Sequence, residues 1–291
     1  MAADPPSTAS ELRRLDVELV RQGLARSRGQ ARELIDMGVV LVDGRPGKAS
    51  TKVAATTAIR LTAEPDRWVG RAAYKLLEAL RVFGPAGLGV TNARCLDVGA
   101  STGGFTQVLL EAGAAHVTAL DVGHGQLVTA IAGDPRVEER SGMNIRDVAA
   151  GDLGAEFDVV VADLSFISLS TALPAMVSQL RPGGDLVALV KPQFEVGRDR
   201  LARTGVVTSR AERRRVLGAV VGSARRLGVD IHGITSSPIR GAEGNREYLL
   251  WVRQRSDGAA GTSEAPAPLS EQELDALVAD VTSSHTDSTT R

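Results

Sequence analysis

Beyond residue 92 the chain repeats one pattern: a short apolar run, a turn rich in glycine and a longer stretch with apolar residues at helical spacing. Apolar runs of this kind are typical of strands buried in a mainly parallel sheet, because helices cover both faces of such a sheet. The candidate strands are residues 94–98, 116–122, 157–162, 185–190, 231–236 and 247–252. The alternation predicts an α/β domain with a doubly wound sheet over residues 71–255. The last two runs lie close together, which predicts an antiparallel hairpin at one edge.

Residues 11–62 carry a different pattern, of two short helices followed by short strands. The first predicted helix has apolar residues at helical spacing: Leu12, Leu15, Leu19 and Val20. Ser27 is placed to cap a second helix, which holds Ala31, Leu34 and Ile35 and stops at Gly38. Asp43-Gly44 is a hairpin turn, and a further strand is expected at residues 58–61. These elements predict a small α+β domain, joined to the larger one by a linker at residues 63–70.

The two ends of the chain are expected to be flexible. Residues 1–10 lack the charged start and apolar stretch of a signal peptide, and no run is long enough to cross a bilayer, so we expect a soluble, cytoplasmic protein without a membrane partner. Residues 256–291 are rich in Ser, Thr, Ala, Pro and Asp and are predicted to be mostly disordered. Within them, Ser270 and Glu273 form a capping box that predicts a short amphipathic helix.

The net charge of -1 hides an uneven distribution along the chain. Residues 11–60 hold ten Lys or Arg against six Asp or Glu, a net charge of +4, whereas residues 256–291 hold one basic residue against seven acidic ones, a net charge of -6. A basic module with an acidic tail is a common layout of nucleic-acid-binding proteins, although a basic face is more often only solvated surface. The single cysteine, Cys95, excludes a disulfide framework and a cysteine-based zinc site, and no metal is expected.

A glycine-rich turn follows the first strand of the larger domain, in the run Cys-Leu-Asp-Val-Gly-Ala-Ser-Thr-Gly-Gly-Phe-Thr that begins at Cys95. Glycines let the backbone approach a ligand, and ligands bind where a doubly wound sheet reverses its strand order. The spacing matches neither the dinucleotide fingerprint nor a Walker loop, so phosphate binding is disfavoured. Asp121 follows the second strand, where a carboxylate can accept hydrogen bonds from both hydroxyls of a ribose.

This combination predicts S-adenosylmethionine as the cofactor. The alternative is that the glycines only form a tight turn between strand and helix and that Asp97 is only a helix cap or turn residue. The candidate cofactor residues are Asp97, Gly99, Ser101, Thr102, Gly103, Gly104, Phe105, Asp121 and Asn144. Asn144, after a weak third strand, fits a contact with the adenosine part and an ordinary turn equally well.

Ionisable residues lie where the predicted strands end. Asp163 and Lys191 end two successive strands, Glu247 begins the last one, and Lys75 lies on the helix before the sheet. Methylating a hydroxyl requires a base or polarising group and an oxygen aligned with the methyl group, and a lysine with carboxylate neighbours can serve. Taken singly, each of these residues is also explained as a solvated strand end.

Together these residues resemble a known family. The Tyr-Lys-Leu helix at Lys75, the glycine loop, Asp163, Lys191-Pro192 and Arg246-Glu247-Tyr248 are similar to the FtsJ-like ribose 2′-O-methyltransferases, which have a Rossmann-like fold. The resemblance implies a catalytic tetrad of Lys75, Asp163, Lys191 and Glu247, in which Lys191 activates the 2′-hydroxyl.

The N-terminal segment resembles an S4 RNA-binding domain. The matching residues are Arg14-Leu15-Asp16, Gly23-Leu24-Ala25, Ser27-Arg28, Ala31-Arg32, Leu34-Ile35, Gly38 and Val42-Asp43-Gly44. The resemblance implies phosphate contacts by Arg14, Arg26, Arg28, Arg32 and Lys48. An S4 domain before an FtsJ-like core is the arrangement of the TlyA family, similar over about residues 12–252. It implies methylation of cytidine 2′-hydroxyls in 16S and/or 23S ribosomal RNA, with ribosomal RNA or ribosomal subunits as the partner.

Two alternatives of other classes stay open at this point. The family has carried a hemolysin label, which would make the protein membrane-active, and a methyltransferase fold can also bind RNA as a silent assembly factor. The absence of a spanning apolar run argues against the first. The presence of all four tetrad residues argues against the second.

Overall fold

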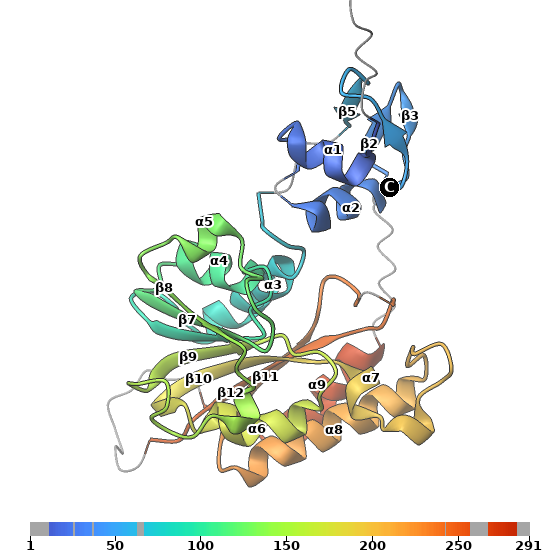
Figure 1. Ribbon diagram of the computed structural model, residues 1–291. Coiled ribbons are helices and arrows are strands. Elements are labelled where there is room, and N and C mark those ends of the chain that lie inside the picture. Colours follow the sequence, from blue (N-terminus) through green and yellow to red (C-terminus); the bar gives the residue numbers. More distant parts are fainter. Residues whose placement is uncertain are drawn as a thin grey trace, which may run out of the picture. The chain divides into compact units, whose positions relative to one another are not determined.

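The computed structural model describes residues 12–25, 27–36, 38–62, 67–241, 243–256 and 267–283. The chain divides into two compact units, Met1–Val69 and Gly70–Arg291 (Figure 1). Each unit has a hydrophobic core of its own.

The first unit packs two helices, α1 (Leu15–Arg21) and α2 (Arg28–Asp36), beside short antiparallel strands. The Ser27 hydroxyl caps α2 by accepting a hydrogen bond from the Gln30 amide at 3.2 Å, as predicted. The strands are β1 (Arg13–Arg14), β2 (Val40–Val42), β3 (Arg45–Pro46), β4 (Lys52–Val53) and β5 (Ile59–Leu61). β2 and β3 form the predicted hairpin around Asp43-Gly44, and β5 pairs with the other side of β2. The expected α+β arrangement is confirmed.

The start of the first helix differs from the prediction. Leu12 is exposed and precedes the helix, because Arg13 and Arg14 form β1 and pair with β4. The Leu15 amide then donates to the carbonyl of Thr51 at 2.8 Å, which holds the chain extended up to that residue. This pairing joins segments almost forty residues apart, so helical spacing alone could not reveal it.

The second unit contains a seven-stranded sheet in the order β11-β12-β10-β9-β6-β7-β8. Its strands are β6 (Arg94–Val98), β7 (His116–Asp121), β8 (Val137–Ser141), β9 (Phe157–Ala162), β10 (Leu180–Val190), β11 (Asp230–Ser236) and β12 (Tyr248–Arg253). β12 runs antiparallel to both of its neighbours, whereas the other neighbouring pairs are parallel. The doubly wound mixed sheet and its antiparallel hairpin are confirmed, with β11 rather than β12 at the edge.

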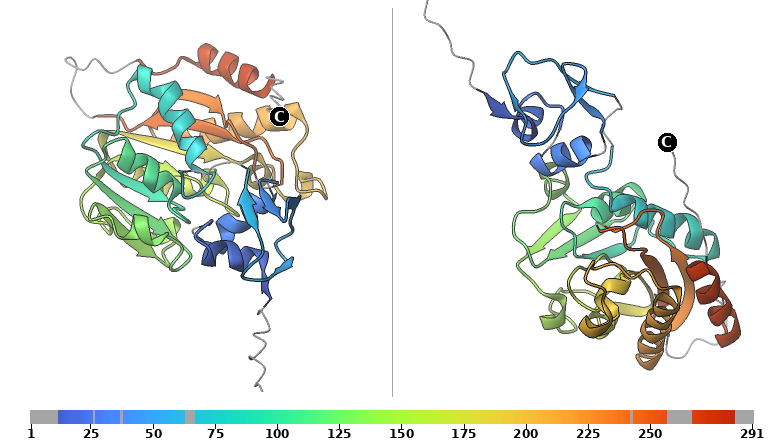
Figure 2. Two further views of the ribbon diagram at one scale, coloured as in Figure 1. Left: turned by 90° about the horizontal axis from the view of Figure 1, so that it is seen from above. Right: turned by 90° about the vertical axis from the view of Figure 1, so that its right-hand side faces the viewer.

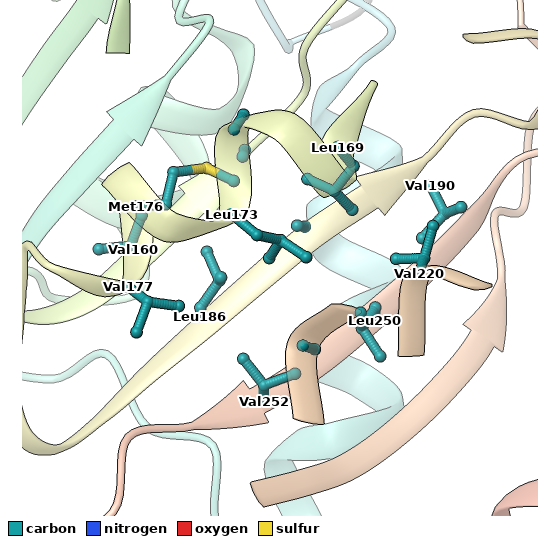
Figure 3. Packing of buried hydrophobic residues seen from close by; sticks show 14 of the residues in the cluster. Val160, Leu169, Leu173, Met176, Val177, Leu186, Val190, Val220, Leu250 and Val252 are labelled. Atoms are coloured by element: carbon teal, nitrogen blue, oxygen red, sulfur yellow. The ribbon is translucent and has the colours of Figure 1, made fainter. Parts of the chain in front are cut away.

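Helices cover both faces of this sheet (Figure 1). α3 (Ala73–Phe83) and α4 (Gly104–Glu111) pack on one face, and α6 (Leu169–Val177) and α8 (Arg210–Arg226) on the other. The shorter helices are α5 (Thr129–Ala132) and α7 (Pro192–Glu195), with 3-10 turns at Gly84–Ala86, Ile145–Asp147 and Arg198–Arg200. Figure 3 shows Leu173 and Met176 of α6 near Val160 and Leu186 of the sheet, and Val220 of α8 near Leu250. Burying such side chains contributes about 1.5–3 kcal/mol each, so this layer holds the strand ends in place.

A further helix, α9 (Glu271–Ser283), lies beside α8 and β11 (Figure 2). The Ser270 amide donates to the Glu273 carboxylate at 2.9 Å, and the Ser270 hydroxyl accepts from the Glu273 amide at 3.3 Å, so the predicted capping box is confirmed. Leu274, Val278 and Val281 are buried in the core of the unit. Part of the tail is therefore built into the folded domain, while residues 257–266 and 284–291 lie outside the described residues.

Candidate active site

Four ionisable side chains from separate segments meet at one edge of the sheet. The Lys75 ammonium lies 3.0 Å from Asp163 Oδ2 and 2.8 Å from Glu247 Oε2. The Lys191 ammonium lies 2.7 Å from Asp163 Oδ1 and donates to the Ser165 hydroxyl at 2.8 Å. The structure thus brings together all four members of the tetrad that the resemblance implied, with Asp163 bridging the two lysines.

The sheet topology explains why residues far apart in sequence meet here. β9 and β10 are parallel neighbours, so Asp163 and Lys191, which follow them, emerge at the same edge. β12 is antiparallel to β10, with Tyr248 opposite Val190, so the residue before β12 also lies at this edge. That residue is Glu247, and α3 supplies Lys75.

The cluster is buried and electrically balanced. Lys75, Lys191 and Glu247 are 6%, 8% and 3% exposed. Burial by itself raises the pKa of the Asp163 carboxyl, but the charges and hydrogen bonds of Lys75 and Lys191 outweigh it and hold that pKa below its ordinary value. Asp163 therefore stays ionised near neutral pH. Buried charges are tolerated where they are paired, as these two cations and two anions are.

A pocket of about 580 Å³ opens beside the cluster. Four of the predicted cofactor residues line it, together with the tetrad carboxylate Asp163: Gly99, Ser101, Asp121 and Asn144. Both oxygens of Asp121 accept backbone hydrogen bonds at 2.8 Å, one from Ser101 and one from Gly123. This ties the end of β7 to the glycine loop and fixes the orientation of the carboxylate at the pocket wall.

The other predicted cofactor residues do not line this pocket. Thr102, Gly103, Gly104 and Phe105 are not among the residues that line the pocket, and Phe105 is buried in the core. Gly99 is required by the fold itself, because a Cβ there would lie 2.8 Å from the Asp163 carbonyl oxygen. The glycine pattern therefore reflects close backbone approach as well as ligand access.

Asp97 occupies an unusual position under the same loop. It is fully buried, and its Oδ2 accepts a hydrogen bond from the Thr106 hydroxyl at 2.7 Å. Its Oδ1 has no hydrogen-bond partner within the part of the chain that the structure describes. Burial raises the pKa of Asp97 to about 7. Asp97 thus supports the loop from below and does not line the pocket.

Asn144 caps a turn and also lies in the lining of the pocket. Its side-chain oxygen accepts from the Arg146 amide at 3.2 Å and so caps a 3-10 turn. Asn144 and Arg146 also line the pocket, as Asp121 does. The capping contact fixes the amide where it can face a bound ligand.

In the first unit, three of the predicted RNA-binding arginines converge on one carboxylate. Asp16 is fully buried and pairs with Arg14 at 2.9 Å, Arg28 at 3.2 Å and Arg32 at 3.3 Å. The hydrogen bond from Arg14 is the main cause that holds the pKa of Asp16 well below its usual range, against its burial. Each guanidinium keeps an exposed part, so the group presents a fixed surface of net positive charge.

The remaining residues predicted to contact RNA are Lys48 and Arg26. Lys48 is exposed in the loop before β4. Arg26 lies outside the described residues.

Sequence reasoning missed two residues beside the tetrad. Ser165 accepts the hydrogen bond from Lys191, and Phe166 is 92% exposed with a left-handed backbone, φ +65°. The Phe166 ring centroid lies 5.4 Å from that of Phe194, which follows Lys191 by three residues. An exposed phenylalanine held in this conformation is rare. The sequence indicated them only by their position two and three residues after Asp163.

Comparison with known proteins supports both units. The FtsJ-like methyltransferase family model matches residues 68–254, and the S4 domain model matches residues 13–59. The 16S/23S rRNA (cytidine-2′-O)-methyltransferase TlyA of Mycobacterium tuberculosis is 50% identical over 248 residues, covering 84% of this chain and 91% of that protein. The 23S rRNA (cytidine-2′-O)-methyltransferase TlyA of Campylobacter jejuni is 30% identical over 251 residues, covering 80% and 96%.

A solved structure from Streptococcus thermophilus, which bears a provisional hemolysin name, is also similar. It is 35% identical with a TM-score of 0.71, covering 94% of this chain and 96% of that one. Among the described residues, no helix combines the length and apolar character needed to cross a membrane. With its S4 domain, its methyltransferase domain and these relatives, the chain belongs to the TlyA family of FtsJ-like methyltransferases.

Proposed function

We propose that the protein transfers a methyl group from S-adenosylmethionine to the 2′-hydroxyl of a cytidine in ribosomal RNA. The observation that carries this proposal is the position of Asp163, which bridges Lys75 and Lys191 and also lines the 580 Å³ pocket. Asp163 therefore belongs both to the pocket and to the pair of buried lysines. This arrangement suits a reaction in which a methyl group held in the pocket meets a hydroxyl activated by a lysine.

The pocket residues fit the proposed cofactor. Asp121 is held where its carboxylate can accept hydrogen bonds from ribose hydroxyls, and Asn144 offers an amide in the same pocket. The backbone around Gly99 and Ser101 can approach the methionine part closely. When bound, S-adenosylmethionine supplies an electrophilic methyl group on a sulfonium.

The tetrad residues have different roles in activating the 2′-hydroxyl. Lys191 first releases its ammonium proton to solvent and then accepts the proton of the 2′-hydroxyl, and Asp163 stabilises the ammonium that results. Ser165 holds the Lys191 amine from a second direction. Lys75 keeps Asp163 oriented and balances its charge, and Glu247 in turn holds Lys75. Phe166 exposes an aromatic face near Lys191 on which a nucleobase can stack.

The S4 unit supplies affinity for RNA in this proposal. Arg14, Arg28 and Arg32 share the Asp16 carboxylate and leave donors exposed for phosphate oxygens. The partner is then ribosomal RNA or a ribosomal subunit in the cytoplasm. The two TlyA relatives differ in the RNAs that their names give, 16S/23S in one and 23S alone in the other. Either or both are therefore substrates to be tested.

The test is a methyl-transfer assay with radiolabelled S-adenosylmethionine and purified ribosomal subunits, followed by mapping of 2′-O-methylated nucleotides. We expect cytidine 2′-O-methylation by the wild type and loss of most turnover in Lys191→Ala and Lys191→Arg, with cofactor and RNA binding retained. Arg226→Ala, which removes an exposed cation from α8, is the control and should keep normal rates. Near-normal turnover in Lys191→Ala would refute the assignment of the base.

The same preparation separates the alternatives. Lysis of erythrocytes by purified protein, without methylation of RNA, would favour a membrane-active function. RNA binding without methyl transfer on either subunit would favour a silent assembly factor. Activity in Lys191→Arg but not in Lys191→Ala would indicate that charge or positioning matters and proton transfer does not.

A further inference from the structure

A second pocket of the larger unit is lined by four arginines and is separate from the cofactor pocket. Its volume is about 310 Å³. Arg210 and Arg213 come from the first turn of α8, and Arg240 and Arg246 from the loop between β11 and β12. The residues described in its lining include no Asp or Glu. The residue types therefore indicate a site for an anion.

Two of these arginines carry charge that no carboxylate offsets. Arg210 donates to the Ala279 carbonyl at 3.4 Å, and Arg213 donates to the Thr208 carbonyl at 2.6 Å and to the Val207 carbonyl at 3.2 Å. Within the described part of the chain, neither has a carboxylate within 4.0 Å. Arg213 is only 9% exposed, and its Nε lacks a partner among the described residues. A buried cation without a counter-charge is costly, so a bound anion would stabilise this arrangement.

The pocket is held in shape before any ligand arrives. Asn245 is buried, accepts from the Val207 amide at 2.9 Å and donates to the Gly205 carbonyl at 2.9 Å. It therefore joins the segment before α8 to the loop that carries Arg240 and Arg246. The start of α8, a helix of 17 residues, adds the positive end of its dipole at the same place.

The loop of the pocket is also in contact with the catalytic tetrad. Arg246 directly precedes Glu247, and a Cβ on Gly241 would lie 2.5 Å from Glu247 Oε1. A ligand bound at the arginines would consequently contact the loop that leads into Glu247, the carboxylate paired with Lys75. This places the pocket where the nucleic-acid backbone next to a reacting nucleotide could be held.

We propose that these arginines bind a backbone phosphate of the RNA substrate near the nucleotide that is methylated. This inference rests on the proposed function. Guanidinium groups match the oxygens of a phosphate with paired hydrogen bonds, and phosphate contacts fix the register of a nucleic acid without reading its sequence. The described lining contains no aromatic residue on which a base could stack, which favours a phosphate over a whole nucleotide.

The test compares Arg210→Ala/Arg240→Ala with a matched control, Arg225→Ala/Arg226→Ala. The control removes the same two charges at the other end of α8 and also releases a contact with α9, since Arg225 lies 3.7 Å from Glu271. Affinity of the intact protein for ribosomal RNA is measured as a function of salt. We expect the test variant to lose about tenfold or more in affinity and its salt slope to fall by about one, the value for one lost phosphate contact, while the control stays near wild type.

Cofactor affinity and melting temperature, measured on the same samples, should match the wild type within error. A salt slope and KM for RNA unchanged from wild type in the test variant, with wild-type methylation intact, would overturn this inference and leave the proposed function standing. Stabilisation by inorganic phosphate that the test variant loses, with an unchanged RNA slope, would also overturn it, because the pocket would then bind a free ion. If the wild type itself neither binds nor methylates RNA, the proposed function fails.

Discussion

Replacing Asp163 with Asn removes the negative charge that Lys75 and Lys191 share while keeping the size of the side chain. The two lysine side chains are 7% and 10% exposed, so the variant leaves two buried cations beside the Glu247 carboxylate, which lies 2.8 Å from Lys75. Loss of one partner of a buried ion pair typically costs about 3–5 kcal/mol, because the other charge is left uncompensated. Since the Asp163 side chain is 12% exposed, water offsets part of this, and we expect a loss of about 3 kcal/mol in unfolding free energy.

The same variant makes a prediction about pH. The pKa of Asp163 is lowered in the folded protein, so its stabilisation is present above the unfolded value near 3.9 and is lost as the pH falls through the folded value. The difference in unfolding free energy between wild type and Asp163→Asn should therefore stay constant from about pH 5 to 8. It should shrink below about pH 4.

Urea unfolding at a series of pH values measures both effects. The control is Glu78→Gln, which breaks a surface pair of similar length, 2.7 Å, with an Arg81 side chain that is 70% exposed. Exposed pairs of this kind contribute about 0.5 kcal/mol or less. Equal losses in the two variants, or an Asp163→Asn protein that keeps both its stability and its methyl transfer, would refute the account of a buried bridging carboxylate.

Three other predictions follow from buried groups. Because the pKa of Asp97 is raised to about 7, its contribution to the free energy of unfolding is greatest below about pH 4 and falls as the pH rises to about 7. Asp97→Asn should flatten this pH dependence in urea unfolding. At 1.36 kcal/mol per pKa unit, the variant should exceed the wild type in unfolding free energy by at most about 4 kcal/mol at pH 8. Truncation after Arg255 should cost at least about 2 kcal/mol, seen as a lower melting temperature, because Leu274 and its buried neighbours on α9 leave the core. Asp16→Ala should weaken RNA binding without changing cofactor affinity, as measured by titration, because Arg14 and the other two guanidiniums lose their common anchor.

Local pattern was sufficient for most of the fold. Unbroken apolar runs predicted the strands of the larger unit because both faces of those strands are covered, and the capping box at Ser270 predicted α9 because a cap depends on four consecutive residues. The tetrad could be named from motif resemblance, and the topology then explains why Asp163 and Lys191 lie together. These features depend on neighbours in sequence or on the order of strands.

Burial and long-range pairing were decided only by the tertiary structure. Asp97 and Asp121 each lie near the end of a strand beside the same glycine loop. Asp97 is fully buried beneath the loop and has a raised pKa, whereas Asp121 lines the pocket. Arg14 was expected as a phosphate contact, but the buried Asp16 beside it is also shared with Arg28 and Arg32. That sharing, and β1 in place of a longer helix, depend on partners distant in sequence. Spacing along the chain determines which face of a helix or strand a residue occupies. The packing of other segments determines what covers that face, and therefore which charged groups are paired, buried or accessible to a ligand.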